Sequence, residues 1–293
     1  MAGLASFGAQ VYLFPAEVEP ADWKEPADYV LEHLGDNDLV RVHPTWNEDP
    51  LPYLTEVGDQ ISRQHDPVLG DLQGAERVWI LAEEERWQEA VARLPYEPAR
   101  QNIRSFGNVK VIETTLPDDA HASYVFLEQL QAAKVERVTP SKKGEEEVQV
   151  RHCKNWSERD RRWDCGGRDK WLYVGEVYRF IGDDAHRCIW AHPLPDGQRL
   201  RITFPHVPLA KELRVRAGML FQAGRKKSDG TVRMRLLVDG EERGEYTYPP
   251  QTTRWNLHVF DTSELAGTDA PVTLEVRADS IKNRFFCVNG WVF

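Results

Sequence analysis

The chain has 293 residues, which is too long for one small core and suits two domains of ordinary size. Hydrophobic residues make up 41% of it and charged residues 29%, values that exclude wholesale disorder. A formal net charge of -10 argues against non-specific nucleic-acid binding, which needs a basic face to neutralise phosphates. We therefore expect a globular protein that has no nucleic-acid partner.

The first 135 residues alternate short apolar runs with stretches of helical spacing. Asp22 is placed as the N-cap of the first helix, with Glu25 three residues further on as its capping-box partner. The expected elements, in chain order, are a helix over 23–34, a strand over 39–43, a helix over about 51–62, a strand over 77–82, a helix over 84–94 and a hairpin of strands 102–106 and 109–114. This alternation predicts a small α/β domain with a partly parallel sheet.

The chain beyond the strand 39–43 carries the candidate site of this first domain. Ligands of open α/β sheets bind at the carboxyl ends of strands, and His43, Trp46, Asn47 and Glu48 lie at such an end. His43 near Glu48 suits either a base with its orienting acid or half a metal site, and equally a hydrogen-bonded surface residue. A Gly-rich phosphate loop, a nucleophile elbow and a Walker lysine are all missing. We therefore expect no catalytic residues here.

Four segments of the first domain follow one another in a recognisable order. They are Trp23–Val30, Asp38–Trp46, Glu76–Leu81 and Ser105–Val109. Over residues 10–116 the chain resembles the soluble extracytoplasmic domain that follows the membrane helices of bacterial glycosyltransferases similar to protein mannosyltransferases and lipid-A aminoarabinose transferases. The resemblance implies a membrane glycosyltransferase as the parent or partner protein. It also implies that the catalytic part, which uses polyprenyl-phosphate sugars, lies outside this chain.

The second half has a different character. Residues 136–150 include a polar, charged run without apolar anchors, which predicts a linker between a first domain of residues 1–135 and a second of 151–293. Beyond it, short strands with period-two alternation predict an all-β sandwich, most simply a jelly roll. The expected strands cover 172–174, 187–191, 199–204, 212–220, 232–238, 242–248, 255–260, 272–277 and 285–288.

All four cysteines lie in this second half, at Cys153, Cys165, Cys188 and Cys287. Because no CxxC pair is present, a zinc site is disfavoured and two disulfides are expected. Cys153–Cys165 would close a local loop, and Cys188–Cys287 would join the first and last strands of the sandwich. Four reduced thiols in a cytoplasmic protein are the alternative. We expect no cofactor and no metal, except that a structural calcium ion near Asp183 and Asp184 is allowed for.

The sandwich also holds the candidate sugar site. The segments Leu236–Glu241, Trp255–Ser263 and Ala270–Arg277 resemble the galactose-binding-like jelly rolls used as carbohydrate-binding modules. Sugars stack their apolar faces on aromatic rings, while planar polar groups bind the hydroxyls. A polar loop contains the residues with that chemistry, and loop packing is the competing interpretation for its tryptophans. These residues are Trp156, Arg159, Trp163, Asp164 and Arg168.

No segment reaches the roughly 20 apolar residues of a membrane span, and the apolar start Leu4–Phe14 lacks a basic flank. Extracytoplasmic localisation would therefore need a membrane segment not present in this chain. The leading interpretation is a non-catalytic extracytoplasmic region, with a glycan or glycolipid as ligand and a membrane glycosyltransferase as parent or partner. The alternatives are a structural or protein-interaction module without a small ligand and, third, a glycoside hydrolase with paired carboxylates.

Overall fold

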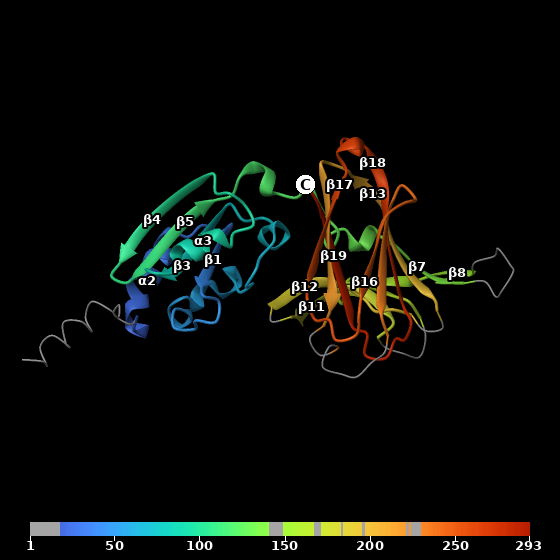
Figure 1. Ribbon diagram of the computed structural model, residues 1–293, viewed down its shortest axis with the longest axis horizontal. Helices are drawn as coiled ribbons and strands as arrows, with labels where there is room; N and C mark the ends of the chain where they lie inside the picture. The colour runs from blue at the N-terminus through green and yellow to red at the C-terminus, as the bar shows by residue number, and fades with distance from the viewer. Residues whose placement is uncertain are drawn as a thin grey trace, which may run out of the picture. The chain divides into compact units, whose positions relative to one another are not determined.

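The computed structural model describes residues 18–140, 149–166, 171–182, 184–194, 197–220, 223 and 230–293. The segment Leu4–Phe14, Arg168 and Asp183, all singled out above, lie outside these ranges. The chain divides into two compact units, residues 1–121 and 122–293 (Figure 1). Each unit has its own sheets and its own core.

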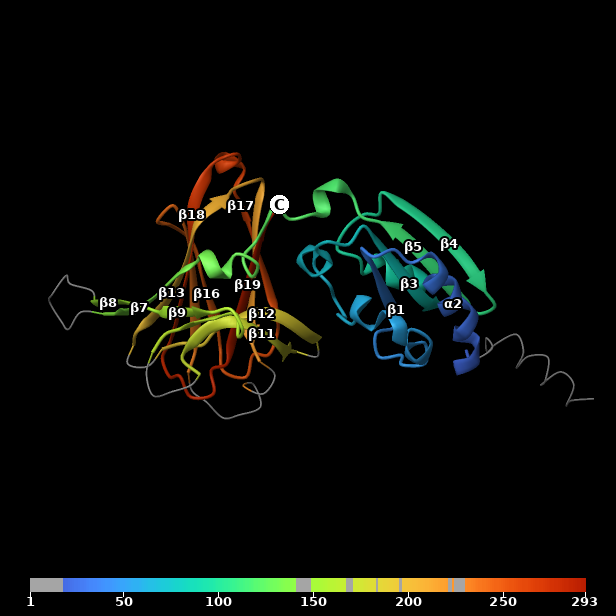
Figure 2. The ribbon, with the colours of Figure 1, turned by 180° about the vertical axis from the view of Figure 1, so that it is seen from behind.

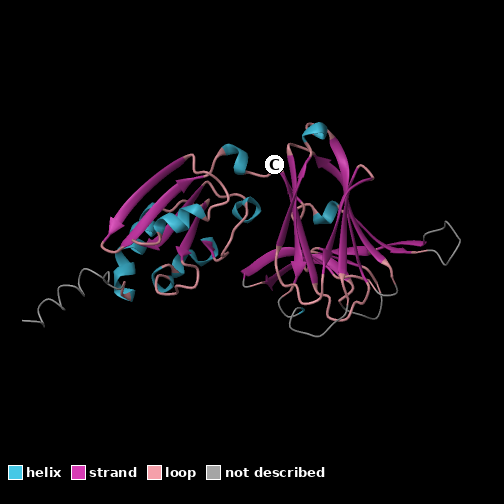
Figure 3. Cartoon of the chain, viewed as in Figure 1, coloured by secondary structure: helices cyan, strands magenta, loops and turns pink. Residues whose placement is uncertain are grey.

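The first unit is built around a five-stranded sheet in the order β2-β1-β3-β5-β4, accompanied by short helices (Figure 3). Its elements are η1 (Pro20–Trp23), α2 (Lys24–His33), β1 (Asp38–His43), η2 (Leu51–Tyr53), η3 (Thr55–Gln60), β2 (Ile61–Ser62), η4 (Leu69–Leu72), β3 (Arg77–Glu83), α3 (Trp87–Ala92), β4 (Arg100–Phe106), β5 (Val109–Thr115) and η5 (Asp118–Ala120).

The sheet of the first unit is mixed. β1 pairs in parallel with β2 and β3, whereas β3 and β4 both pair antiparallel with β5. On one face, Val40 and Val42 of β1 pack with Trp23, Ala27 and Val30 from the η1–α2 segment. The expected hairpin around Gly107 is present, and Gly107 has the positive φ of 58° that the tight turn requires.

Two helical expectations differ from the structure. The predicted helix over 51–62 is a pair of 3-10 turns followed by β2, because Pro50 and Pro52 donate no backbone N–H. The first helix also starts earlier than predicted. The capping box joins Glu19 and Asp22, and the Glu19 backbone N–H donates to the Asp22 carboxylate at 3.0 Å. Asp22 is therefore the second partner of the capping box rather than the N-cap.

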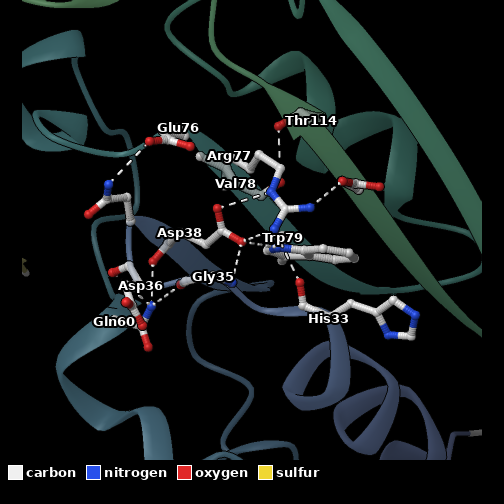
Figure 4. Close-up of polar contacts among 12 residues, drawn as sticks. His33, Gly35, Asp36, Asp38, Gln60, Glu76, Arg77, Val78, Trp79 and Thr114 are labelled. Carbon is white, nitrogen blue, oxygen red and sulfur yellow. Dashed lines mark hydrogen bonds and ion pairs between the residues drawn. The ribbon is translucent and has the colours of Figure 1, made fainter.

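A buried carboxylate ties the start of β1 to β3 (Figure 4). Asp38 is 3% exposed and accepts hydrogen bonds from Arg77 Nη2 at 2.6 Å, Trp79 Nε1 at 3.0 Å and the Gly35 backbone N–H at 2.7 Å. Burial alone would raise the pKa of Asp38, but these donors outweigh it and hold that pKa below its usual value. The carboxylate is fully bonded within the unit, so we read this network as structural.

The second unit is a sandwich of two antiparallel sheets (Figures 1 and 2). One sheet has eight strands in the order β17-β14-β19-β12-β11-β10-β9, with β6 also paired to β19, and the other has six in the order β16-β15-β18-β13-β7-β8. The elements are β6 (Tyr124–Val125), η6 (Leu130–Ala132), β7 (Lys134–Thr139), β8 (Gln149–His152), β9 (Lys154–Ser157), β10 (Arg162–Asp164), β11 (Tyr173–Ile181), β12 (Asp184–Ala191), β13 (Arg199–Pro208), β14 (Glu212–Met219), β15 (Val232–Val238), β16 (Glu241–Tyr248), β17 (Asn256–Asp261), η7 (Ser263–Leu265), β18 (Asp269–Ala278) and β19 (Phe286–Val292).

From β13 onward the chain passes repeatedly between the two sheets, as a jelly-roll-like sandwich requires. Period-two alternation places one face of each strand in the core. In β15, Val232, Met234, Leu236 and Val238 are buried and their neighbours are partly exposed. The predicted β-sandwich is confirmed.

The division of the chain falls earlier than predicted. The expected linker over 136–150 overlaps β7, which pairs with β13 and with β8, so this stretch belongs to the sandwich. Val135 and Val138 of β7 are buried, but they lie three residues apart among charged residues, so β7 lacks the period-two alternation that indicates a strand. Residues 141–148 of the proposed linker lie outside the described ranges.

Candidate functional site

The two predicted sugar-stacking tryptophans face each other across a β-ladder. Trp156 of β9 pairs directly with Trp163 of β10, and their ring centroids are 5.6 Å apart at an interplanar angle of 57°. Both side chains are half-buried and pack against the core of the sandwich. Trp163 Nε1 donates a hydrogen bond to the Leu130 carbonyl of η6 at 2.9 Å. One side of this pair is therefore used for packing.

The polar residues predicted to accompany these tryptophans are at the surface. Arg159 is exposed in the turn between β9 and β10. Asp164 is exposed at the end of β10, where its Oδ1 accepts the Gly166 backbone N–H at 2.8 Å. The structure thus places Trp156, Trp163, Arg159 and Asp164 on one hairpin.

Both predicted disulfides are present. Cys153–Cys165 closes the base of the β9–β10 hairpin. Cys188–Cys287 joins β12 to β19, whose register pairs Trp190 with Cys287. β19 is the last strand, but β12 is not the first, because β6 to β11 precede it in the same unit. These earlier strands fall in 122–181, where sequence inspection foresaw only a short strand over 172–174.

The core-facing side of the eight-stranded sheet continues past the tryptophans to residues that the sequence analysis missed. Trp163 pairs with Val174, so by strand alternation Glu176, Tyr178 and Phe180 lie on the same face of β11. Tyr178 is 63% exposed and Phe180 is 60% exposed. The spacing of aromatic residues two positions apart was a usable signal. It was overlooked because the expected strand covered only residues 172–174, whereas β11 continues to Ile181.

Two arginines hold the carboxylate of Glu176 on this face. Arg187 of β12 donates to Glu176 Oε1 through Nε at 2.8 Å and Nη2 at 2.6 Å, and Arg161 donates through Nε to Oε2. Burial would raise the pKa of Glu176, but the hydrogen bonds and charges of Arg187 and Arg161 outweigh it and hold the pKa below its usual value. The carboxylate is therefore ionised at neutral pH.

Trp190 lies on the opposite face of the same sheet and belongs to a packed aromatic cluster. It is 7% exposed and stacks against Tyr173 and Phe285, each at a centroid distance of 5.8 Å. His192 packs beside it, and burial lowers the pKa of His192 to about 4. Trp190 is therefore a core residue of the sandwich.

Of the four site residues predicted in the first unit, Asn47 and Glu48 line one pocket, and His43 and Trp46 are outside its lining. His43 is 5% exposed, and its Nε2 lies 3.5 Å from Oε2 of Glu89 on α3. Its acidic neighbour is therefore Glu89 rather than Glu48, which reflects the alternation of side chains along β1. Burial lowers the pKa of His43 despite this carboxylate. Trp46 is 69% exposed, and the guanidinium of Arg86 lies over its ring.

Asn47 and Glu48 line a shallow pocket at the carboxyl ends of β1 and β2, with an empty volume of about 310 Å³. Its other lining residues are Val42, Thr45, Leu51, Ile61, Ser62 and Arg63. Asn47 is nearly buried, and its Oδ1 accepts the Asp49 backbone N–H at 3.0 Å. Glu48 is the one carboxylate that lines the pocket, so this pocket lacks the pair of acids that a glycoside hydrolase needs.

Within the described ranges, no group of three or more His, Cys, Asp or Glu side chains is arranged to hold a metal ion. In the same ranges, no helix combines the length and the apolar character needed to cross a membrane. The calcium ion allowed for near Asp183 and Asp184 falls partly outside the described residues, and it stays a prediction.

No protein-family model matches the chain, and no curated protein matches it. Similar solved structures include a family 51 carbohydrate-binding module from Clostridium perfringens in complex with methyl-galactose. That module shares 12% identity at a TM-score of 0.28 over 40% of this chain and 79% of its own. A second family 51 module, solved with GlcNAc and INT domains from Clostridium perfringens ZmpB, shares 12% identity at a TM-score of 0.32. That match covers 66% of this chain and 41% of the other.

A family 36 carbohydrate-binding module in complex with calcium and xylotriose is also similar, at 12% identity and a TM-score of 0.24. The match covers 40% of this chain and 88% of that module. The sugars and the calcium ion in these structures are ligands of those modules, and a likeness at 12% identity assigns none of them to this chain.

Proposed function

We propose that residues 122–293 form a non-catalytic carbohydrate-binding module that works outside the cytoplasm. The observation that carries the proposal is the β9–β10 hairpin, where two half-buried tryptophans pair directly across the ladder and the same hairpin exposes Arg159 and Asp164. Aromatic rings on a rigid ladder provide the apolar stacking surface that a pyranose face needs, and the planar polar groups supply hydrogen bonds.

The disulfides support the extracytoplasmic setting. Both disulfides lie in the sandwich, and disulfides persist mainly in oxidising compartments. The finer part of the proposal is that the chain belongs to, or associates with, a membrane glycosyltransferase that uses polyprenyl-phosphate sugars. This part rests on the sequence resemblance of residues 10–116 alone. Co-purification of the chain with such a transferase from its natural membranes would test it.

The binding proposal is tested on a glycan array with the intact chain and with Trp156→Ala and Trp163→Ala. We expect specific glycan binding that weakens at least about tenfold in both variants, since stacking loses one ring each time. Arg277→Gln, on the other sheet, is the matched surface control and keeps full binding. A folded protein that binds no glycan on the array rejects the proposal.

The second candidate function is a structural or protein-interaction module. The hydrogen bond from Trp163 Nε1 to Leu130 and the packing of both indoles against the core favour it, because they assign these tryptophans a structural role. The same array separates the two functions. Glycan binding that is unchanged in both tryptophan variants would locate the sugar elsewhere, whereas no binding at all would favour the interaction module.

A further inference from the structure

The β11–β12 hairpin carries an open aromatic surface beside the tryptophans, and we name it the Tyr178–Phe180 platform. Tyr178 is directly opposite Arg187, and Phe180 is directly opposite Ala185. Residues directly opposite each other share a face of the sheet, so the small Ala185 leaves the Phe180 ring uncovered on the β12 side. With exposed fractions of 63% and 60%, the two rings form an apolar surface that the described residues leave open.

The platform is backed by a rigid layer. Val177 and Ile181 point to the other face of β11, where they are buried with the Cys188–Cys287 disulfide and Trp190. Val177 pairs directly with Cys188. The two exposed rings therefore stand on a hairpin whose reverse side is packed and covalently tied to β19. A surface held in this way does not lose much backbone entropy when it binds a ligand.

The charge beside the rings has a definite sign. Arg161 and Arg187 share the single carboxylate of Glu176, which leaves one net positive charge at this end of the face. The Arg187 side chain is 60% exposed and that of Arg161 is 49% exposed, whereas that of Glu176 is 17% exposed. The guanidinium groups of Arg161 and Arg187 are therefore accessible to solvent, whereas the Glu176 carboxylate is mostly buried. This local positive charge contrasts with the net charge of -10 of the chain.

We infer that the Tyr178–Phe180 platform binds an acidic saccharide. The pyranose faces stack on Tyr178 and Phe180, and a carboxylate of the sugar is bound by Arg187 and Arg161. Guanidinium groups are suited to this because their planar donors match a carboxylate geometrically. Residues two apart on one face of a strand are about 6.6–6.8 Å apart, so the two rings serve neighbouring sugar units of an oligosaccharide. The inference rests on the proposed carbohydrate-binding function and names its ligand class and a further contact surface on the face that carries the tryptophans.

The test uses the intact chain on an array of matched acidic and neutral probes. Suitable pairs are tri-galacturonic acid with galactotriose and sialyl-lactose with lactose. We expect at least one acidic probe to bind at least about tenfold more tightly than its neutral partner. Its affinity falls as salt is raised, because an exposed ion pair is screened. Tyr178→Ala and Phe180→Ala weaken that binding at least about tenfold, and Arg187→Gln removes the preference for the acidic probe.

Two control variants and one folding check accompany these measurements. Val259→Ala removes another exposed apolar side chain, on β17, and Arg277→Gln removes another exposed arginine paired with a glutamate. Both are expected to bind like the unaltered protein. Thermal melting is the folding check, and we expect Tyr178→Ala and Phe180→Ala to melt like the unaltered protein because both side chains are exposed.

The outcomes separate the two levels of the proposal. If glycan affinity is unchanged in Tyr178→Ala and Phe180→Ala, or if neutral probes bind more tightly than acidic ones, the acidic-saccharide inference is wrong. The proposed carbohydrate-binding function would still hold in that case. Failure to bind any glycan overturns both.

Discussion

Two aromatic pairs lie on the same face of the eight-stranded sheet, yet they differ in what covers them. Trp156 and Trp163 are half-buried, because η6 supplies a carbonyl to Trp163 and the core packs against both rings. Tyr178 and Phe180, further along the same face, are more than half exposed. The first pair therefore contributes to packing and leaves only part of its surface for a ligand, whereas the second pair leaves more than half of its surface open. In the sequence, the two tryptophans gave the clearer indication of a sugar site. In the structure, they are less exposed than Tyr178 and Phe180.

The largest expected loss of stability comes from removing the disulfides. Cys153–Cys165 closes the hairpin of the first aromatic pair, and Cys188–Cys287 packs against the reverse side of β11, which carries the second. Removing Cys188–Cys287 with a double Cys→Ala substitution frees a loop with a sequence separation of 99 and should cost about 4–5 kcal/mol of unfolding free energy. Removing Cys153–Cys165, with a separation of 12, should cost about 3 kcal/mol. Urea unfolding of both double variants measures the difference. An equal or reversed order would show that loop length does not decide these stabilities.

A smaller loss of unfolding free energy is expected when the aromatic side chains are replaced, and this loss differs between the two pairs. Trp163→Ala should lose about 2–3 kcal/mol, less than the range for fully buried aromatics because the indole is only half-buried. Trp163→Phe keeps most of the packing and should lose about 1 kcal/mol, mainly the bond to Leu130. Tyr178→Ala, by contrast, should stay within about 0.5 kcal/mol of the unaltered protein. Chemical denaturation compares the three, and a large loss for Tyr178→Ala would contradict the distinction.

The smallest effect concerns the pH dependence of the charged group between the pairs. The pKa of Glu176 is lowered in the folded state from its ordinary value of 4.5. The ionised Glu176 carboxylate therefore contributes its full stabilisation at pH values above its ordinary pKa of 4.5. This stabilisation is lost as the pH falls through the lower pKa of the folded state. Because the arginines are largely exposed, we expect the contribution to be roughly 0.5–1 kcal/mol.

Unfolding free energies of the unaltered protein and Glu176→Gln, measured between pH 3 and pH 7, test this point. The two curves should be separated at neutral pH and should converge in acid. A constant separation over the whole range would assign the effect to packing.

The sequence predicted some parts of this molecule well and others poorly, for physical reasons. The strands from β13 onward were foreseen because they alternate cleanly between buried and exposed positions, as Val232–Val238 does. Cys153–Cys165 and Cys188–Cys287 followed from the number and spacing of the cysteines. β7 was missed because its buried valines are embedded in charged residues, and their partner strand β13 is distant in the sequence. Pairing with a distant strand is tertiary information that local spacing does not contain.

The candidate sites were also predictable only in part, because the sequence shows residue types but not their tertiary contacts. The residue types for sugar stacking were identifiable at Trp156 and Trp163, but their burial depends on η6. Tyr178 and Phe180 become conspicuous only when β11 is known to extend to Ile181. His43 pairs with Glu89 across 46 residues, a partner that no local pattern indicates.

The position of β19 has a consequence for the order of events during synthesis. This strand, Phe286–Val292, lies between β14 on one side and β12 and β6 on the other. The eight-stranded sheet therefore cannot close until residue 292 has been synthesised, and until then both flanking strands have an unpaired edge. Contacts between Tyr124 and Val292 also span most of the second unit, which implies slow folding. A nascent chain without β19 therefore keeps this sheet open, and Cys188 cannot form its disulfide until Cys287 has been synthesised.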